Sequence, residues 1–194
     1  MNREIITYTG KVFDFLAPKP EAICIEDIAH TLALTSRFGG HTRTFYSVAE
    51  HCVRASYLLV GDPLLNLMHD SAEAYIGDVI SSQKDGLGWF DVNKHPPKIG
   101  WPLWYQHVEA EIMRNIGKAL GIRALESWLA SPRGVKAADL TMLATEIRDL
   151  MPPAEDGFYT EWTKGATPLP GRIIPWTWQK AETEFLHRYK GLRG

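Results

Sequence analysis

Two histidines and two aspartates of this sequence carry side chains that divalent metal ions prefer, and each stands among apolar neighbours. His51 is next to Cys52, the pair His69-Asp70 interrupts an apolar run, and Asp139 lies in a predicted apolar helix. A carboxylate or imidazole that faces a core needs a partner, because burying an unpaired polar group costs free energy. Two imidazoles and two carboxylates that converge would bind a divalent ion and leave positions open for water.

Taken one at a time, these residues have simpler explanations. A lone buried histidine is most often a core side chain with satisfied hydrogen bonds, and a lone aspartate within a helix most often faces water. The set favours a metal site: a histidine on one predicted helix, His-Asp on the next, and an aspartate on a later one. The adjacent pair can supply two ligands because neighbouring helical residues differ by about 100°.

The elements that must position these side chains are predicted to be mostly α-helices. Residues 4–15 alternate loosely around Gly10, which favours a short N-terminal β-hairpin. Two stretches, 81–104 and 152–175, show no sustained period and are predicted to be irregular. The predicted helices cover about 25–37, 48–60, 63–76, 105–119, 132–151 and 176–190.

Two helix starts have specific capping signals. Ser47-Val48-Ala49-Glu50 has the form of a capping box, in which the serine hydroxyl accepts from the glutamate amide and the glutamate side chain reaches back. Asp62 and Pro63 form an N-cap followed by a first-turn proline. We expect the helix that begins at Pro63 to carry the His69-Asp70 pair and to end at Gly77.

The composition excludes several classes of partner. The formal net charge of −2 and the pI near 6.4 leave no basic surplus for duplex DNA or an anionic membrane as the main partner. Cys24 and Cys52 cannot form a disulfide framework, which suits a reducing compartment. No signal-peptide pattern opens the chain, and no stretch approaches the roughly 20 apolar residues of a membrane span. We expect a cytoplasmic protein whose residues 1–194 form a single domain.

The order H…HD…D, formed here by His51, His69-Asp70 and Asp139, resembles the signature of the HD-domain phosphohydrolases. The stretches RFGGHTRTFYSVAEHC, LMHDSAEAYIGDV and VKAADLTMLATE are similar to the small deoxynucleotide-hydrolysing members of that superfamily. These include the 5′-deoxynucleotidases related to YfbR and the phage dATP triphosphohydrolases called DatZ. The resemblance covers about residues 20–150 and implies an all-α HD-domain helical bundle, followed by a C-terminal loop and helix over 152–194.

The resemblance assigns roles to single positions. His51, His69, Asp70 and Asp139 match the metal ligands, and Glu73 matches the catalytic glutamate that handles protons. The spacing of the sequence agrees, because Glu73 stands at i+3 from Asp70 and at i+4 from His69, which places all three on one side of a helix. A carboxylate beside the metal is well placed for general acid–base catalysis. The alternative for Glu73 alone is a solvent-facing residue near a helix end.

Phosphate groups require positive charge, and the resemblance points to three cations, each of which could otherwise be an ordinary surface side chain. They are Arg37, Lys84 and Lys136. Further candidates for contact with the substrate are Phe38, whose ring could stack on a base, and the small pair Gly39-Gly40, which allows close approach of the backbone. The remaining candidates for substrate contact are His41, Arg43 and Asp78.

The resemblance implies a divalent ion at the HD site, either Zn²⁺, Co²⁺, Mn²⁺ or Fe²⁺, with Mg²⁺ on the phosphates. A dNTP triphosphohydrolase acting on dATP is the first expectation, in a cytoplasm that could be that of a phage host. A 5′-deoxynucleotidase acting on monophosphates and a non-enzymatic HD module are the alternatives. A homo-oligomer, dimer or hexamer, is also implied. Tryptophans in or beside irregular stretches hint at an interface, and core packing explains them equally well: Trp101, Trp104, Trp162, Trp176 and Trp178.

Overall fold

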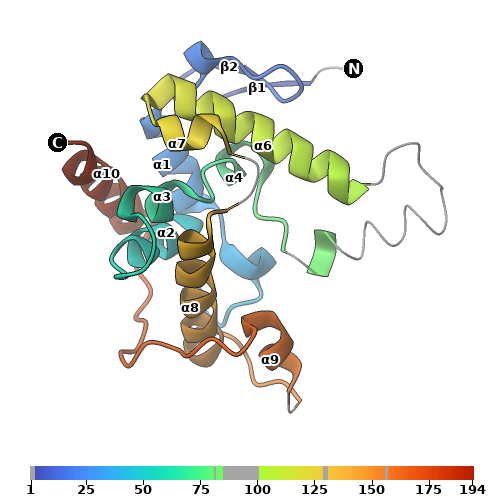
Figure 1. Ribbon diagram of the computed structural model, residues 1–194, viewed down its shortest axis with the longest axis vertical. Helices are drawn as coiled ribbons and strands as arrows, with labels where there is room; N and C mark the ends of the chain where they lie inside the picture. The colour runs from blue at the N-terminus through green and yellow to red at the C-terminus, as the bar shows by residue number, and fades with distance from the viewer. Residues whose placement is uncertain (1–2, 81, 85–100, 129–130, 156) are drawn as a thin grey trace. The chain divides into compact units, whose positions relative to one another are not determined.

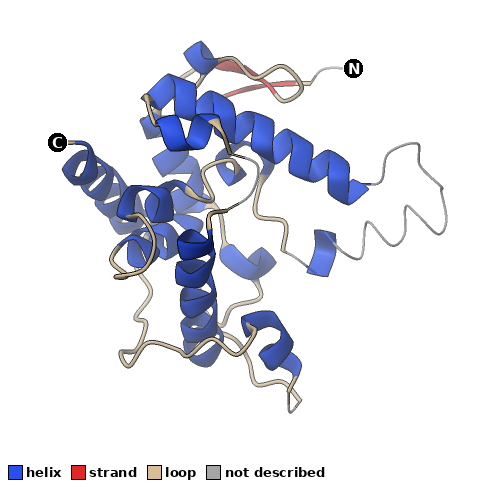
Figure 2. Ribbon diagram, viewed as in Figure 1, coloured by secondary structure: helices blue, strands red, loops and turns tan. Residues whose placement is uncertain are grey.

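The computed structural model describes residues 3–80, 82–84, 101–128, 131–155 and 157–194, and for 101–104 the backbone alone. In these ranges the chain is mostly helical, and one short antiparallel hairpin near the N-terminus supplies the strands (Figure 2). The predicted all-α class with an N-terminal hairpin is therefore confirmed. Most of the stretch 81–104, predicted to be irregular, lies outside the described residues.

The chain forms two compact units. The first unit comprises Met1–Thr31 and Ser71–Ala130, and the second comprises Leu32–Asp70 and Ser131–Gly194. Each unit is thus built from two separate segments of the sequence, and the chain passes from the second unit to the first between Asp70 and Ser71.

In the first unit a hairpin and several helices share a small core. Ile5 pairs with Phe13 across the hairpin, and the Phe13 ring stacks on the Tyr75 ring with centroids 4.0 Å apart. The helix α6 packs along α7. The elements, coloured from blue to yellow in Figure 1, are β1 (Glu4–Ile6), β2 (Val12–Asp14), η1 (Pro20–Ala22), α1 (Ile25–Leu34, whose last residues belong to the second unit), α4 (Glu73–Ile76), α6 (Trp101–Leu120) and α7 (Arg123–Glu126).

In the second unit α2 packs against α3, α8 and α10. A buried apolar cluster that includes Tyr46, Met142 and Leu150 fills the space beside α2 and α8. The elements are η2 (Arg37–Gly40), α2 (Val48–Ser56), α3 (Pro63–Met68), α8 (Arg133–Leu150), α9 (Phe158–Thr163) and α10 (Trp178–Arg193).

The predicted helix starts are largely confirmed. Ser47 Oγ accepts a hydrogen bond from the Glu50 amide at 3.1 Å, and Asp62 accepts from the Leu65 amide at 2.9 Å ahead of Pro63. The second half of the capping box is wrong. The Glu50 carboxylate accepts instead from Arg54 Nε and from the Trp176 amide, both at 2.8 Å, and so ties the segment before α10 to α2.

The predicted continuous helix over 63–76 is also wrong. Helix α3 ends at Met68, residues 69–72 form turns, and α4 begins at Glu73. His69 Nδ1 lies 2.8 Å from the Asn66 carbonyl oxygen, so the imidazole competes with backbone amides for this acceptor. Side chains that bond to nearby backbone groups in this way weaken helix continuity.

Other helix boundaries differ more modestly from the predictions. Helix α1 ends at Leu34 rather than at residue 37, since η2 and its glycines follow. Helix α10 begins at Trp178, where Thr177 Oγ1 accepts from the Lys180 amide at 3.3 Å. The short helix α9 interrupts the stretch 152–175 that we expected to be irregular.

Three further observations concern the cysteines, the Trp176 ring and the length and apolar character of the helices. Cys24 and Cys52 are both reduced and form no disulfide. Arg54 and Lys180 both lie over the Trp176 ring, at 4.7 and 4.8 Å from its centroid, so part of the ring surface is covered within the chain. No helix in the described ranges combines the length and the apolar character that a bilayer crossing requires.

Candidate metal centre

Four predicted ligands meet within the second unit. His51 comes from α2, His69 and Asp70 follow α3, and Asp139 comes from α8. His51 Nε2 lies 3.3 Å from His69 Nε2, 3.7 Å from Asp70 Oδ2 and 3.5 Å from Asp139 Oδ1. His69 Nε2 lies 3.3 Å from Asp70 Oδ2 and 4.0 Å from Asp139 Oδ1. Residues that are far apart in the sequence thus present nitrogen and oxygen atoms to one point.

The outward-facing nitrogen of each ring fixes its tautomer. His69 Nδ1 faces the Asn66 carbonyl at 2.8 Å, and a carbonyl can only accept, so this nitrogen carries the proton. His51 Nδ1 lies 2.6 Å from the Glu146 carboxylate, which likewise accepts. In the neutral form of each ring the lone pair is therefore on Nε2, the nitrogen that faces the other proposed ligands.

This donor set fits a divalent cation. The two imidazole Nε2 atoms lie 3.3 Å apart, and each lies within 4.0 Å of one oxygen of Asp70 and one of Asp139. Lone pairs and anionic oxygens at such distances repel unless positive charge lies among them. His51, His69 and Asp70 form the one group of metal-ligating side chains within mutual reach in the described ranges, and Asp139 adds a fourth ligand atom, its oxygen Oδ1. A mixed nitrogen and oxygen set of this kind suits Zn²⁺, Co²⁺, Mn²⁺ or Fe²⁺.

Behind His51 lies Glu146, a fully buried carboxylate on α8. Its Oε1 accepts from the Tyr46 hydroxyl at 2.9 Å and from His51 Nδ1 at 2.6 Å, and its Oε2 lies 3.4 Å from Arg37 Nε. Burial alone raises the pKa of Glu146, but the Arg37 guanidinium and His51 outweigh it and hold the pKa below its usual value. Glu146 is therefore anionic at neutral pH.

Asp139 is also held in its charged form. Burial raises the pKa of Asp139, but His69, His51 and Lys136 together lower it well below its usual value. Lys136 lies one helical turn earlier, and its Nζ donates to Asp139 Oδ2 at 2.7 Å. The Lys136 side chain is 52% exposed, so it combines contact with a ligand and access from solvent.

Arg37 is engaged inside the centre. Its Nη1 donates to Asp70 Oδ2 at 3.2 Å, while its Nε faces Glu146, and its side chain is largely buried. The guanidinium carbon also lies 5.5 Å from the centroid of the Phe38 ring. The role in phosphate binding predicted for Arg37 stays a prediction. The observed contacts give Arg37 a second role, which is to hold the carboxylates of Asp70 and Glu146.

The segment after Arg37 has an unusual backbone. Phe38 has φ of 55° and is buried, while Gly39 and Gly40 have φ of 58° and 82° and are exposed. Left-handed conformations of this kind suit glycine and strain a phenylalanine. The stacking of a base on Phe38 stays a prediction for a ring that is buried here.

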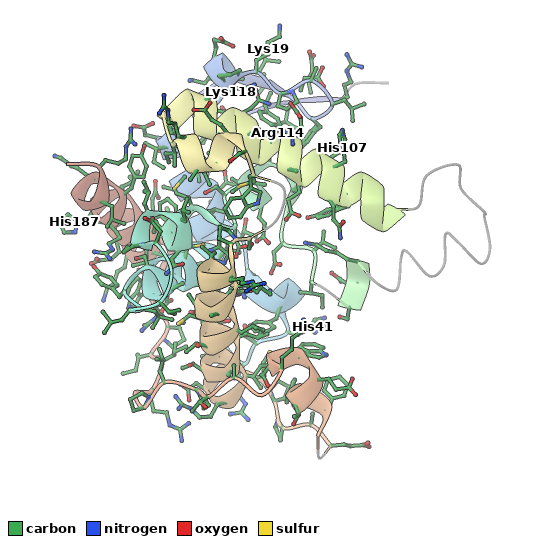
Figure 3. All side chains as sticks on the ribbon, viewed as in Figure 1. Lys19, His41, His107, Arg114, Lys118 and His187 are labelled. Carbon is green, nitrogen blue, oxygen red and sulfur yellow. The ribbon has the colours of Figure 1, made fainter. Side chains whose placement is uncertain are left out.

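The remaining candidates for substrate contact in the same segment lie on the surface of the second unit. His41 is exposed just after η2, where Figure 3 labels it, and Arg43 is exposed while its amide donates to the Leu150 carbonyl at 2.9 Å. His187 projects from α10 and is exposed as well (Figure 3).

Three predicted site residues belong to the first unit. The Glu73 side chain is buried at the start of α4, and Asp78 follows Gly77 just beyond that helix. Lys84 Nζ lies 3.8 Å from Glu109 Oε1 and 4.5 Å from the centroid of the Tyr105 ring. Their roles in proton transfer, substrate binding and phosphate binding stay predictions.

The sequence analysis missed Glu146. Its signal was available, because it stands seven residues after Asp139, which is about two helical turns and so the same face of α8. A carboxylate on the inward face of a helix, in register with a predicted ligand, indicates a partner for a buried cation or imidazole.

Comparisons with known proteins give relatives but no activity. No protein-family model matches the chain. The uncharacterized protein YfdR of Escherichia coli (strain K12) is 34% identical over 191 residues, which span 97% of this chain and 94% of that protein. The uncharacterized protein RCAP_rcc00048 of Rhodobacter capsulatus is 39% identical over 90 residues, which span 41% of this chain and 46% of that protein.

Proposed function

We propose that this chain, which belongs to the family of the Escherichia coli protein YfdR, is a metal-dependent phosphohydrolase of deoxynucleotides built on an HD domain. The observation that supports this most is the convergence of two imidazoles, each with Nδ1 bonded outward, and two carboxylates. His51, His69, Asp70 and Asp139 would hold the ion. A divalent cation there supplies Lewis-acid polarisation of a phosphoryl oxygen and makes a water more acidic.

The cationic side chains of the second unit suit a phosphate group. Phosphoryl transfer requires mainly positioning and neutralisation of charge. Lys136 stands at the solvent-accessible side of Asp139, and its flexible ammonium group binds phosphate oxygens as a point charge. Arg37 forms ion pairs with Asp70 and Glu146, so a second positive charge lies beside the proposed ligands.

Glu73 is the proposed proton carrier. It stands three residues beyond Asp70 in the sequence, and its carboxylate is buried. A buried carboxylate exchanges protons with a reacting group in a defined position, which is the requirement of general acid–base catalysis. In this proposal Glu73 takes the proton of the attacking water and returns it to the leaving group.

The proposed substrate is a deoxynucleoside triphosphate, dATP first, with Mg²⁺ accompanying the phosphates. The family resemblance of RFGGHTRTFYSVAEHC and VKAADLTMLATE supports a deoxynucleotide, while a monophosphate substrate is the alternative. We propose that the reaction takes place in the cytoplasm and that the protein is a homo-oligomer. A non-enzymatic module is the third possibility, and the complete ligand set together with Glu73 argues against it.

Product analysis tests this function. The protein is loaded with Co²⁺ or Mn²⁺ and incubated with each dNTP and each dNMP, with and without a chelator, before the products are separated. We expect chelator-sensitive loss of dATP, abolished in Asp139→Ala and retained in Asp149→Asn, whose carboxylate lies on the same helix away from the ligands. Hydrolysis of monophosphates alone selects the nucleotidase, and no turnover of any deoxynucleotide overturns the proposal.

A further inference from the structure

One buried carboxylate reaches two of the four proposed ligands. Glu146 bonds directly to His51 through Oε1, and its Oε2 faces Arg37, which in turn bonds to Asp70. We propose that Glu146 is a positioning residue that orients His51 directly and Asp70 through Arg37. This inference rests on the metal centre proposed above. It touches neither the point where the ligand atoms meet nor solvent, so its action passes through these neighbours.

The direct contact sets the ring of His51. At 2.6 Å the Nδ1–H donates to a carboxylate that carries full charge, and such bonds are shorter and stronger than neutral ones. In the neutral ring the bond selects the tautomer whose lone pair is on Nε2, and it limits rotation of the ring about χ2. An anionic acceptor behind an imidazole also increases the basicity of the ligating nitrogen.

The indirect contact sets Asp70. Arg37 carries one planar guanidinium, whose Nε faces Glu146 at 3.4 Å while its Nη1 donates to Asp70 Oδ2 at 3.2 Å. Because these nitrogens belong to one rigid plane, an anchored Nε restricts where Nη1 points. Without Glu146, the guanidinium would lose the fully buried one of its two carboxylate partners, and with it one restraint on its orientation.

A third neighbour holds Glu146 itself. The Tyr46 hydroxyl donates to the same Oε1 at 2.9 Å, from a tyrosine that is fully buried in the apolar cluster beside α2. Glu146 is therefore held from three separate segments: by hydrogen bonds from Tyr46 and from His51 of α2, and by an ion pair with Arg37 of η2. Buried contacts of this kind restrict the carboxylate, and loss of one of them leaves a polar group without that partner in a low dielectric.

Competition titration of Co²⁺ against a chromophoric chelator measures the proposed effect on metal affinity. The variant Glu146→Gln keeps the shape of the side chain, but its amide nitrogen would face Arg37 Nε, donor against donor. The matched control is Asp149→Asn, which removes another buried α8 carboxylate that binds Arg148 and Arg172 and contacts no proposed ligand. We expect Glu146→Gln to weaken Co²⁺ binding about 10–100-fold, as loss of an outer partner of a ligand does, and Asp149→Asn to leave it unchanged.

A spectroscopic readout separates positioning from mere stability. In protein with ¹⁵N-labelled histidine, we expect His51 in the Nδ1–H tautomer with a downfield, exchange-protected proton, and a mixed tautomer in Glu146→Gln. If Glu146→Gln does not fold, Tyr46→Phe is the second variant, because it deletes only the hydroxyl that donates to Glu146. Tyr46→Phe should shift the His51 proton and weaken Co²⁺ binding by a smaller factor.

The outcomes distinguish this inference from the function on which it rests. Tight Co²⁺ binding by the wild-type protein, unchanged in Glu146→Gln or in Tyr46→Phe, would overturn the role of Glu146 and leave the metal centre standing. Wild-type protein that binds Co²⁺ no better than His69→Ala would overturn the metal centre itself, and the inference with it. Weakened binding in Glu146→Gln with a normal Asp149→Asn control supports both.

Discussion

Gly134, at the start of α8, lies directly against Gly61 in the loop before α3. A Cβ atom added to Gly134 would lie 2.7 Å from Gly61 Cα, and one added to Gly61 would lie 2.8 Å from the Gly134 carbonyl carbon. Asn66 closes the same loop by donating to the carbonyls of Ala55 and Val60. This close contact sets the distance between the segment that carries His69 and the helix that carries Asp139.

Gly134→Ala is therefore expected to disturb the metal centre. The added methyl group overpacks a backbone contact, which costs about 1–3 kcal/mol of the free energy of unfolding. Because Gly134 is five residues before Asp139, the shift of α8 should also lower Co²⁺ affinity. Thermal unfolding and Co²⁺ titration measure the two effects.

The control for this variant is Gly191→Ala, at a helical glycine of α10 that has open space around it. There the alanine should stabilise the protein slightly or leave it unchanged, with normal Co²⁺ affinity. A Gly134→Ala protein as stable as the Gly191→Ala protein would show that the contact between α8 and the loop tolerates a side chain.

Lys136→Ala is expected to separate substrate binding from metal binding. Removing an ammonium group that neutralises Asp139 leaves the ligand more negative, so Co²⁺ affinity should be retained or rise. The KM for the deoxynucleotide should increase about tenfold through loss of a charged contact to phosphate, which is worth about 1.5 kcal/mol. Steady-state kinetics with Lys190→Ala as the exposed control checks this, and an unchanged KM would argue against Lys136 as a phosphate ligand.

Glu73→Gln is expected to slow turnover strongly without loss of the metal. An amide cannot accept a proton from the attacking water, so kcat should fall about 10²–10⁴-fold. Co²⁺ affinity should match that of the wild-type protein, because the proposed ligand set does not include Glu73. Glu126→Gln, at an exposed residue of α7 in the same unit, provides the control, and full activity of Glu73→Gln would remove Glu73 from the mechanism.

Asp149 should make stability depend on acid pH. The hydrogen bond from Arg148, together with the Ile173 amide at 2.8 Å, lowers the pKa of Asp149 to about 2 from the usual 3.8. A carboxyl group with a lower pKa in the folded state stabilises the protein above its unfolded pKa and loses that contribution as the pH falls toward the folded value. At roughly 1.4 kcal/mol per pKa unit, discounted for the solvent exposure of Arg172, this amounts to about 1–2 kcal/mol.

Urea unfolding of Asp149→Asn across the acid range measures this contribution. Above about pH 5 the variant should be less stable than the wild-type protein by that amount. The difference should narrow as the pH drops through the interval from 3.8 to about 2, because a protonated aspartic acid and an asparagine are both uncharged. A difference that does not change with pH would show that the charge of Asp149 contributes nothing.

Local chemistry explains which elements were predictable from the sequence. Ser47 and Asp62 act as N-caps through bonds to amides three residues later, so the starts of α2 and α3 follow from short stretches. The paired prolines after Met151 likewise end α8 where expected. The four proposed ligands were identified from residue type and order, and their ligand atoms do approach one another.

Contacts between distant segments explain what was missed. The break after Met68 depends on the bond between His69 and the Asn66 carbonyl, and no glycine or proline marks it in the sequence. The Glu50 carboxylate does not complete the capping box, because it accepts a hydrogen bond from the amide of Trp176, which is 126 residues away. In the sequence, Glu146 is indistinguishable from other helical glutamates. The structure shows its partner, His51, which stands 95 residues earlier in the chain.

The most direct test of the account is the release of phosphate from deoxynucleotides while Co²⁺ is added stepwise to the metal-free protein. The account predicts that hydrolysis of dATP, or of a deoxynucleoside monophosphate, rises with bound metal and levels off at one ion per chain. Asp139→Ala should remain inactive throughout the titration. Stoichiometric binding of Co²⁺ without hydrolysis of any deoxynucleotide, or hydrolysis that does not depend on the metal, would contradict it.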